Sequence, residues 1–374
     1  MNFDYNEEQR LLAESVQRFV AQDYDFETRR RIVASPEGAS AKAWGTMADL
    51  GLLGLAISPD HGGFGGGAVD LMSTMEAIGS ALVVEPYLST VGIGARFVAA
   101  AGTAAQRETL LPAIVEGKLK LAFAHTEAEG RYNLAHVALE ERGLKLRGTK
   151  HVVLHAPQAD KLVVSARSGG RGVTDPQGIS LFLVDAKAPG VSMKPYRTLD
   201  EVRAADVTFE DVQVSAEDRL GDSGAALPLI EEIVDFATAL VCAEAVGAIK
   251  FANDTTLEYL KTRKQFGVPI GSFQALQHRL VDMVISYEQA RSMASLACAR
   301  VDAEKDPAMR RRIVSAAKVR IADACRHVSQ ESIQLHGGMG MSEELKVSHT
   351  FRRLTMIAQQ FGDADHHLER FAHP

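Results

Sequence analysis

The chain of 374 residues contains only three cysteines, Cys242, Cys298 and Cys325, and no two of them have C-x-x-C spacing. An odd number of cysteines without that spacing excludes a disulfide framework and argues against a zinc site. This usage favours a reducing compartment. A basic surplus is also missing, because 41 Lys and Arg residues face 48 Asp and Glu residues. Proteins that bind nucleic acid usually carry such a surplus, so we expect no nucleic-acid partner.

Long hydrophobic runs are absent as well. No uninterrupted apolar run approaches the roughly 18 residues that a membrane-spanning helix needs, so no membrane partner is expected. The first residues, MNFDYNEEQR, lack the basic and then apolar pattern of a secretory signal. We therefore expect a cytoplasmic location. With 46% hydrophobic and 24% charged residues, the composition excludes a disordered chain.

The order of residue patterns predicts an α+β protein in three parts. Residues 1–118 repeat apolar residues at helical spacing and predict an N-terminal helical domain. Residues 119–218 hold short runs such as KLVVSA and ISLFLVDA between turn residues, which predicts a middle β barrel or sandwich. Residues 219–374 predict a C-terminal four-helix bundle, with long helices over about 225–262 and 308–334. Apolar stripes on such helices often form an oligomer interface.

A first glycine cluster contains Gly63, Gly65 and Ala68 in a formal G-x-G-x-x-A pattern, with Glu85 near the distance of a ribose-binding acid. This pattern is the best case for a nicotinamide dinucleotide site. Four residues separate the glycines from the preceding apolar run, however, and no second βαβ unit follows. A loop between two helices is therefore the favoured interpretation.

Two later segments contain residues that are suited to binding an anion. In YLKTRKQFGVPIGSFQALQHR, Arg263 offers a planar fork that matches a phosphate. Phe266 and Gly267 are expected to end a helix there, because Pro269 prevents its continuation. In QLHGGMG, residues 334–340, the glycines let backbone amides approach an anion, although a helix C-cap and turn is the favoured interpretation of this segment taken alone.

These segments together resemble the acyl-CoA dehydrogenase family. The resemblance rests on R-x-Q-F-G-x-P-I, a Gln-bearing helix, and Q-x-x-G-G-x-G about 70 residues later. SPDHGGFGGG is similar to the family's P-E-x-x-G-G-x-G loop, and AFAHTE is similar to its A-x-x-T-E. The helical, β and helical order agrees over essentially the whole chain. Within the family, the chain resembles the small subunit of two-subunit enzymes such as pimeloyl-CoA dehydrogenase.

The resemblance implies FAD as the cofactor and an acyl-CoA as the substrate. In the family a carboxylate removes the α proton, the β carbon delivers hydride to the flavin, and an electron-transfer flavoprotein usually accepts the electrons. Each FAD contacts two subunits. The residues that match those of the neighbouring subunit are Arg263, Gln265, Phe266, Gln334, Gly337 and Gly338. On the chain's own side, the matching residues are Phe123 and Thr126.

The segments that would hold this chain's own flavin ring depart from the family. The family's T-E-P-x-A-G-S-D becomes TEAEGRYN at residues 126–133, and W-I-T-N becomes VVLH at residues 152–155. Leu154 cannot donate the hydrogen bond that the family's Thr makes to the flavin. The aromatic wall is missing too, unless His151 or His155 replaces it.

The catalytic carboxylate is the largest departure. Phe361 occupies the usual position of the catalytic Glu, and Ala237 occupies the alternative position on the preceding long helix. Asp363 and Asp365 fall where a Thr and a Gln would contact FAD, and Asp363 is a weak candidate for a displaced base. Together with His366 and His367 these acids could suggest a metal cluster, but a solvated helix start is favoured, so no metal is expected.

The losses follow a pattern, since the elements that contact a neighbour's FAD are intact and those that serve the chain's own FAD are not. This predicts a non-catalytic subunit that completes the FAD site of a heteromeric, α2β2 enzyme. Two alternatives stay open. One is a self-sufficient homotetrameric dehydrogenase with a displaced base, and the other is a binding or scaffold protein that keeps the fold without redox work.

Overall fold

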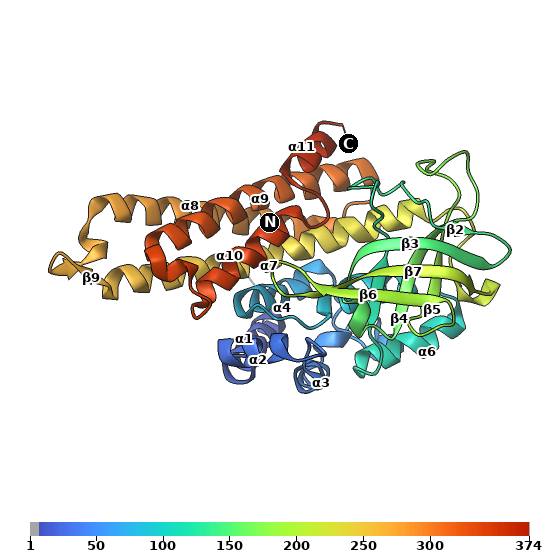
Figure 1. Cartoon of the computed structure of the whole chain (residues 1–374), viewed down its shortest axis with the longest axis horizontal. Helices are drawn as coiled ribbons and strands as arrows, with labels where there is room; N and C mark the ends of the chain where they lie inside the picture. Colours follow the sequence, from blue (N-terminus) through green and yellow to red (C-terminus); the bar gives the residue numbers. More distant parts are fainter. Residues whose placement is uncertain (1–6, 374) are drawn as a thin grey trace. The chain divides into compact units, whose positions relative to one another are not determined.

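A computed structural model describes residues 7–373 of the chain (Figure 1). The described residues form two compact units, each of which collects segments that lie far apart in the sequence. One unit comprises Arg31–Gly67 and Val84–Ala237, and the other comprises the rest of the described chain. The linear boundaries expected from the sequence, 1–118, 119–218 and 219–374, stay a prediction.

The unit that contains the C-terminus is built from helices. Its elements are α1 (Glu7–Asp23), α4 (Ala68–Ala81), α8 (Gln274–Val301), α9 (Pro307–His336), the short η7 (Gly337–Met341), α10 (Lys346–Gln359), α11 (Ala364–Ala372), and the greater part of α7 (Leu227–Thr262). The two long helices expected over about 225–262 and 308–334 are confirmed as α7 and α9. Helix α9 begins where the side chain of Asp306 accepts the N–H of Ala308 and Pro307 takes the first helical position.

Helices α4 and α7 cross at two glycines. A Cβ on Gly79 would overlap the carbonyl oxygen of Glu244, and a Cβ on Gly247 would overlap the carbonyl oxygen of Glu76. In each helix the glycine lies three residues after a glutamate. The carbonyl of that glutamate faces the glycine of the other helix. Such close backbone approach requires residues without a Cβ, which explains why helix-breaking glycines stand inside both helices.

The other unit is built around one eight-stranded sheet. Its strands are β1 (Leu121–Ala124), β2 (Glu140–Glu141), β3 (Lys145–Leu154), β4 (Lys161–Arg167), β5 (Ile179–Asp185), β6 (Val191–Arg197), β7 (Arg203–Gln213) and β8 (Arg219–Leu220). They follow the order β6-β7-β3-β2-β4-β5-β8, and β1 pairs with β4. Most neighbours are antiparallel, while β1 and β2 each pair with β4 in parallel. The expected β domain without βαβ units is therefore confirmed.

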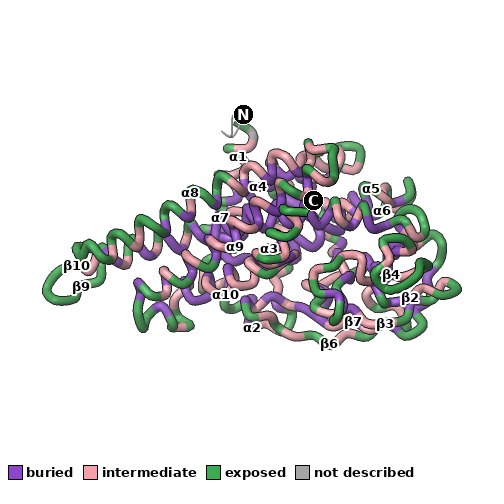
Figure 2. Tube along the Cα trace, turned by 90° about the horizontal axis from the view of Figure 1, so that it is seen from above, coloured by how far each residue is buried: buried purple, intermediate pink, exposed green. Residues whose placement is uncertain are grey.

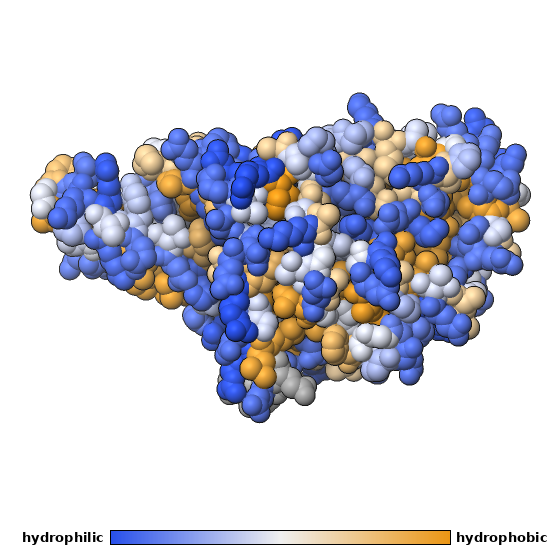
Figure 3. Space-filling view, turned by 90° about the horizontal axis from the view of Figure 1, so that it is seen from below, coloured by the Kyte–Doolittle hydropathy of each residue, from blue (hydrophilic) through white to orange (hydrophobic). Residues whose placement is uncertain are grey.

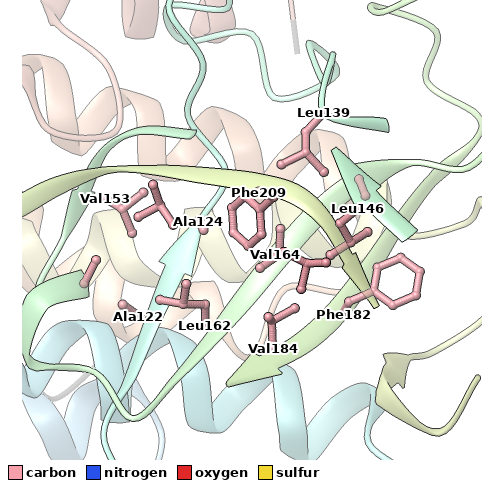
Figure 4. Close-up of a cluster of buried hydrophobic side chains, with 14 of the residues drawn as sticks. Ala122, Ala124, Leu139, Leu146, Val153, Leu162, Val164, Phe182, Val184 and Phe209 are labelled. Atoms are coloured by element: carbon pink, nitrogen blue, oxygen red, sulfur yellow. The ribbon is translucent and has the colours of Figure 1, made fainter. Parts of the chain in front are cut away.

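The core of this sheet lies between its two halves. Figure 4 shows Val164 and Phe182, from β4 and β5, pointing toward Leu146 and Phe209, from β3 and β7. All four are at most 1% exposed. Buried apolar surface contributes about 25 cal/mol per Å², so the burial of this cluster stabilises the unit. The facing halves agree with the expected barrel or sandwich.

Helices and short turns cover the same unit. They are α3 (Ala41–Asp49), η1 (Leu52–Gly54), η2 (Pro59–His61), the π-helical η3 (Leu88–Gly94), α5 (Ala95–Ala101), α6 (Ala104–Val115), η4 (Ala156–Gln158) and η5 (Ala216–Asp218). Helix α2 (Phe26–Ala34), like α7, runs from one unit into the other. The hydroxyl of Thr90 accepts the N–H of Leu121 and donates to its carbonyl, which fixes η3 against β1.

Exposure is highest at the connection between α7 and α8. Figure 2 shows exposed residues throughout the hairpin of β9 (Lys264–Gln265) and β10 (Val268–Pro269), in contrast to the buried stretches of α7. Figure 3 shows apolar side chains at the surface of this tip, at the left of the view. Helix α8 also exposes Val281, Val284 and Ile285 by 56%, 44% and 49%. Within residues 7–373, every helix is too short or too polar to span a bilayer.

Candidate functional site

The first predicted anion-binding segment forms a tight hairpin. Helix α7 ends at Thr262, and the backbone N–H of Ile270 closes the hairpin on the carbonyl of Arg263 at 2.8 Å. Phe266 and Gly267 form the turn with φ of 55° and 81°, as two left-handed residues do in a type I′ turn. The expectation that Phe266 and Gly267 end the helix is therefore wrong, because the helix stops earlier and a β hairpin follows.

The three residues of this hairpin that were predicted to contact FAD are exposed. Arg263 and Gln265 are exposed, and Phe266 is 91% exposed. A large aromatic side chain that is almost fully exposed loses the free energy of burial, which amounts to about 2 kcal/mol. This cost is expected at a surface that another molecule covers.

The second predicted segment follows the end of α9. Gln334 lies in the last helical turn, and the N–H of Gly337 caps the helix on the carbonyl of Gln334. Gly337 has φ of 59°, so its own backbone requires glycine. Gly338 has no positive φ, and a Cβ built there would have no described heavy atom within 4 Å apart from its chain neighbours and the backbone of its own turn. The open space above Gly338 therefore suits the close approach of a ligand to the backbone.

One aromatic contact joins the two segments. The rings of Tyr259 and His336 stack with centroids 4.4 Å apart and an interplanar angle of 28°. Tyr259 lies one turn before Arg263, and His336 directly precedes Gly337. The guanidinium of Arg263 and the amide of Gly338 thus belong to one end of the helical unit. Both segments follow helix C-termini, so Arg263, and not a helix dipole, supplies the positive charge that a phosphate group needs there.

The residues predicted on the chain's own side lie in the β unit. The ring of Phe123, in β1, packs against those of Phe97 and His125 at centroid distances of 4.8 and 5.1 Å. Thr126 follows the strand with an exposed side chain, while its carbonyl accepts the N–H of His151 at 2.8 Å. Phe123 therefore packs against two rings while it stays half-buried, and Thr126 presents a hydroxyl at the surface; contact of either residue with a cofactor stays a prediction.

A buried ion pair anchors the residues next to Thr126. The ammonium of Lys150 donates to the carboxylate of Glu127 at 2.7 Å, the hydroxyl of Ser165 at 3.0 Å and the carbonyl of His125 at 3.2 Å. Burial lowers the pKa of Lys150 to about 8, although Glu127 opposes that shift. Burial also lowers the pKa of His125 to about 3. The sequence interpretation missed Lys150, because β3 also carries Lys145 and Arg147 and nothing in the sequence marks Lys150 as the buried cation.

The end of β3 carries a bulge at which two residues oppose one. Lys150 pairs with Val207 and Val153 pairs with Ala205, so that His151 and Val152 both face Asp206. The carboxylate of Asp206 accepts the N–H of Val152 at 3.2 Å and the hydroxyl of Tyr196 at 3.0 Å, and it lies 3.3 Å from Nδ1 of His151.

These hydrogen bonds hold a strained backbone. Val152 has φ of 50°, which is costly for a β-branched residue. Burial by itself would raise the pKa of Asp206, but the hydrogen bonds from Val152, Tyr196 and His151 outweigh it and leave that pKa lowered. Asp206 is therefore an anion that organises the bulge, and neither Asp206 nor Tyr196 was singled out from the sequence. Leu154, at the end of the strand, supplies no polar group.

The C-terminal loop that carries Phe361 is held by its backbone. The ammonium of Lys318 donates to the carbonyls of Gly362 and Ala358 at 2.6 and 3.2 Å, and Nε2 of His367 donates to the carbonyl of Phe361 at 3.1 Å. Burial, followed by nearby Lys318, lowers the pKa of His367 to about 2, so its ring is neutral. The carboxylate of Asp363 accepts the N–H of His366 at 2.9 Å and thereby caps α11.

The first glycine cluster of the sequence has a structural role. The amides of Phe64, Gly65 and Gly66 donate to carbonyls of residues 54–57, and η1 stands where a dinucleotide-binding motif needs a strand. The G-x-G-x-x-A segment is therefore a hydrogen-bonded loop between helices, as favoured. In the described part of the chain, no group of three His, Cys, Asp or Glu side chains is placed to hold a metal ion.

Comparison with known proteins matches three family models in chain order. They describe the acyl-CoA dehydrogenase N-terminal domain over residues 6–118, the middle domain over residues 122–212 and the C-terminal domain over residues 227–373. A relative by sequence is the caffeyl-CoA reductase-Etf complex subunit CarC of Acetobacterium woodii, which is 32% identical over 82% of each chain.

Two solved structures share the fold over the whole chain. The ChsE4-ChsE5 complex from Mycobacterium tuberculosis is 26% identical, with a TM-score of 0.89, and the match covers 100% of this chain and 98% of that chain. The FAD complex of PigA is 25% identical, with a TM-score of 0.90 and the same coverage.

Proposed function

The chain belongs to the acyl-CoA dehydrogenase family, and from that membership we propose that it is the subunit that completes the FAD site of a heteromeric acyl-CoA dehydrogenase. Its catalytic partner would be a second chain of the same family in an α2β2 assembly. The substrate is an acyl-CoA, and an electron-transfer flavoprotein is the proposed electron acceptor.

The observation behind this proposal is the contrast between two sets of positions. The residues that match a neighbour's FAD contacts are exposed at one end of the helical unit, and the backbone at Gly338 is open to a ligand. At the positions that would use the chain's own flavin, Leu154 has no donor and Phe361 has no carboxylate. The residues present therefore fit the diphosphate of FAD and do not fit its reacting ring.

The chain's own residues have binding tasks in this mechanism. Arg263 would pair its guanidinium with the diphosphate, and the amide of Gly338 would donate to the same oxygens, while the amide of Gly337 caps α9. Gln265 and Phe266 would lie beside them, with Phe266 covered by the ligand or the partner. When bound, FAD supplies the hydride-accepting chemistry that side chains lack. Proton removal from the acyl-CoA would fall to the partner, because Asp363 already caps a helix.

Two of the comparisons support a partner and an acceptor. ChsE4-ChsE5 is by name a complex of two different chains, and the name of the CarC relative places that protein in a complex with Etf. In this chain the three cysteines are free and buried, as suits the reducing cytoplasm that we propose for it.

The test is the flavin content per chain after purification. We expect almost no flavin for the chain alone and, because each heterodimer has one intact ring pocket, about one FAD per two chains after co-expression with the partner. Arg263→Ala should lower the flavin content of the complex. The matched control is Arg326→Ala, which removes an exposed arginine of α9 that pairs with Asp323. One FAD per chain for the protein alone would contradict the proposal and favour the self-sufficient homotetramer.

A further inference from the structure

The two segments proposed to bind the diphosphate lie at the ends of different helices. Arg263 follows the last residue of α7, and Gly337 follows the last residue of α9. A single diphosphate can contact both only if the two helix ends are held at a fixed distance. The stacked rings of Tyr259 and His336 join α7 and α9 at this end of the bundle.

The stack is coupled to Arg263 by the backbone. The N–H of Arg263 donates to the carbonyl of Tyr259 at 2.8 Å, which is the last helical hydrogen bond before the hairpin. A shift of the Tyr259 ring therefore moves the turn from which the guanidinium of Arg263 extends. Tyr259 is half-buried, and its ring meets that of His336.

The other ring is fixed more tightly. His336 is 4% exposed, and its Nδ1 lies 2.8 Å from the carbonyl of Ser332, so Nδ1 carries the hydrogen of that bond. Burial lowers the pKa of His336, although the bond to Ser332 opposes this, so the ring that meets Tyr259 is neutral. Gly337 and Gly338 follow directly, and apart from chain neighbours and the backbone of the same turn no described atom lies within 4 Å of a Cβ built on either of them. The glycine loop is thus supported from the side of His336 and open on the other.

We propose that Tyr259 and His336 are positioning residues that hold Arg263 and the glycine backbone at the spacing of one dinucleotide diphosphate. The inference rests on the proposed function, because it assumes that these two segments bind FAD. It goes further in naming the pair of stacked rings that preorganises them. Preorganisation raises affinity by removing the cost of ordering the two segments at the moment of binding.

The test measures FAD affinity in the complex of this chain with its co-expressed partner, stripped of flavin and titrated with FAD by fluorescence. Tyr259→Ala and His336→Ala should each raise the Kd about tenfold, because a misplaced binding group loses most of its contribution. Tyr259→Phe keeps the stacked ring and should stay within about twofold of the wild type. The double Ala variant should be no weaker than the weaker single variant, because the two rings act as one unit.

A matched control separates positioning from bundle stability. Arg279 of α8 and Glu331 of α9 form a two-pronged ion pair at 2.5 and 3.0 Å, and neither touches Arg263 or the glycines. Arg279→Ala should lower the melting temperature as Tyr259→Ala does and leave the Kd for FAD unchanged.

Three outcomes would overturn the positioning role or the proposed function. An unchanged Kd in both Ala variants, with a raised Kd for Arg263→Ala, overturns the positioning role and leaves the proposed function standing. An equal loss in Tyr259→Phe and Tyr259→Ala also overturns it, since the hydroxyl and not the stacked ring would then matter. A Kd that does not respond to Arg263→Ala contradicts the proposed function itself.

Discussion

The ammonium of Lys150 is fully buried and donates to three oxygens, one of them the carboxylate of Glu127. Lys150→Met leaves that carboxylate buried without its cation, so we expect a loss of about 3–5 kcal/mol in the free energy of unfolding. The double variant Lys150→Met with Glu127→Gln should lose less, because the charge leaves with its partner. Urea unfolding of the full chain measures both. A loss below about 1 kcal/mol in Lys150→Met would show that the pair is unimportant for stability.

Glu76 gives a pH dependence with a definite sign. Burial raises the pKa of this carboxyl from 4.5 to about 7, although Arg291 and Lys250 oppose the shift and Tyr287 also faces it. Between these two values the folded chain binds more protons than the unfolded chain, so stability falls as the pH rises through this window.

Glu76→Gln removes that loss. We expect the variant to be more stable than the wild type by about 2–3 kcal/mol at pH 8 and equal to it near pH 4, since both forms are then neutral. Urea unfolding at the two pH values measures the difference. An advantage of the same size at both values would mean that packing, and not ionisation, causes it.

The crossing of α4 and α7 makes a prediction about elements. Gly→Ala inside a helix normally stabilises it by about 1 kcal/mol. At Gly79 and Gly247 the added Cβ overlaps the carbonyl of the opposite helix, so we expect a loss of about 1–3 kcal/mol instead. Gly45, inside α3, is the matched control, because a Cβ there meets no described atom within 4 Å. Thermal unfolding should show Gly45→Ala raising the melting temperature and the other two lowering it; three equal shifts would refute the crossing.

The predictability of elements from sequence depended on local signals. Asp306 and Pro307 mark the start of α9, and the spacing of apolar residues located the long helices to within a few residues. Strand β6 was missed, because Lys194, Pro195 and Arg197 make it polar and it gains its partners only from β7. The β9–β10 hairpin was missed too, since Phe266 is an unusual residue for a left-handed turn position.

For the whole molecule, the apolar side chains of α8 predict an assembly. Val281, Val284 and Ile285 are about half exposed in the single chain, where they gain little from burial. Ile285→Glu would place a charge in any interface that covers them, so we expect a smaller particle in sedimentation or light scattering. Val173→Glu, at an exposed loop of the β unit, is the control and should leave the particle size unchanged. An unchanged size in Ile285→Glu would place the interface elsewhere.

The residues of the candidate site differ in how far they could be predicted. Arg263, Phe266 and the glycines after His336 could be proposed from the sequence, because each of the two segments proposed to bind FAD is continuous along the chain. Lys150, Asp206 and the pair of Tyr259 with His336 were not found, because their partners come from distant segments. A side chain that acts by touching another element leaves no spacing pattern in one sequence.

Local sequence signals were enough to indicate the family, the order of helical and β parts, and the two segments proposed to contact FAD. They were enough because periodicity, helix caps and short motifs depend on neighbours within a few residues. The folded chain was needed to show that Gly79 and Gly247 allow two helices to cross, that Asp206 holds a strained bulge, and that two stacked rings join the ends of α7 and α9. These features depend on close packing between segments that are remote in the chain, and packing is set by the folded arrangement as a whole.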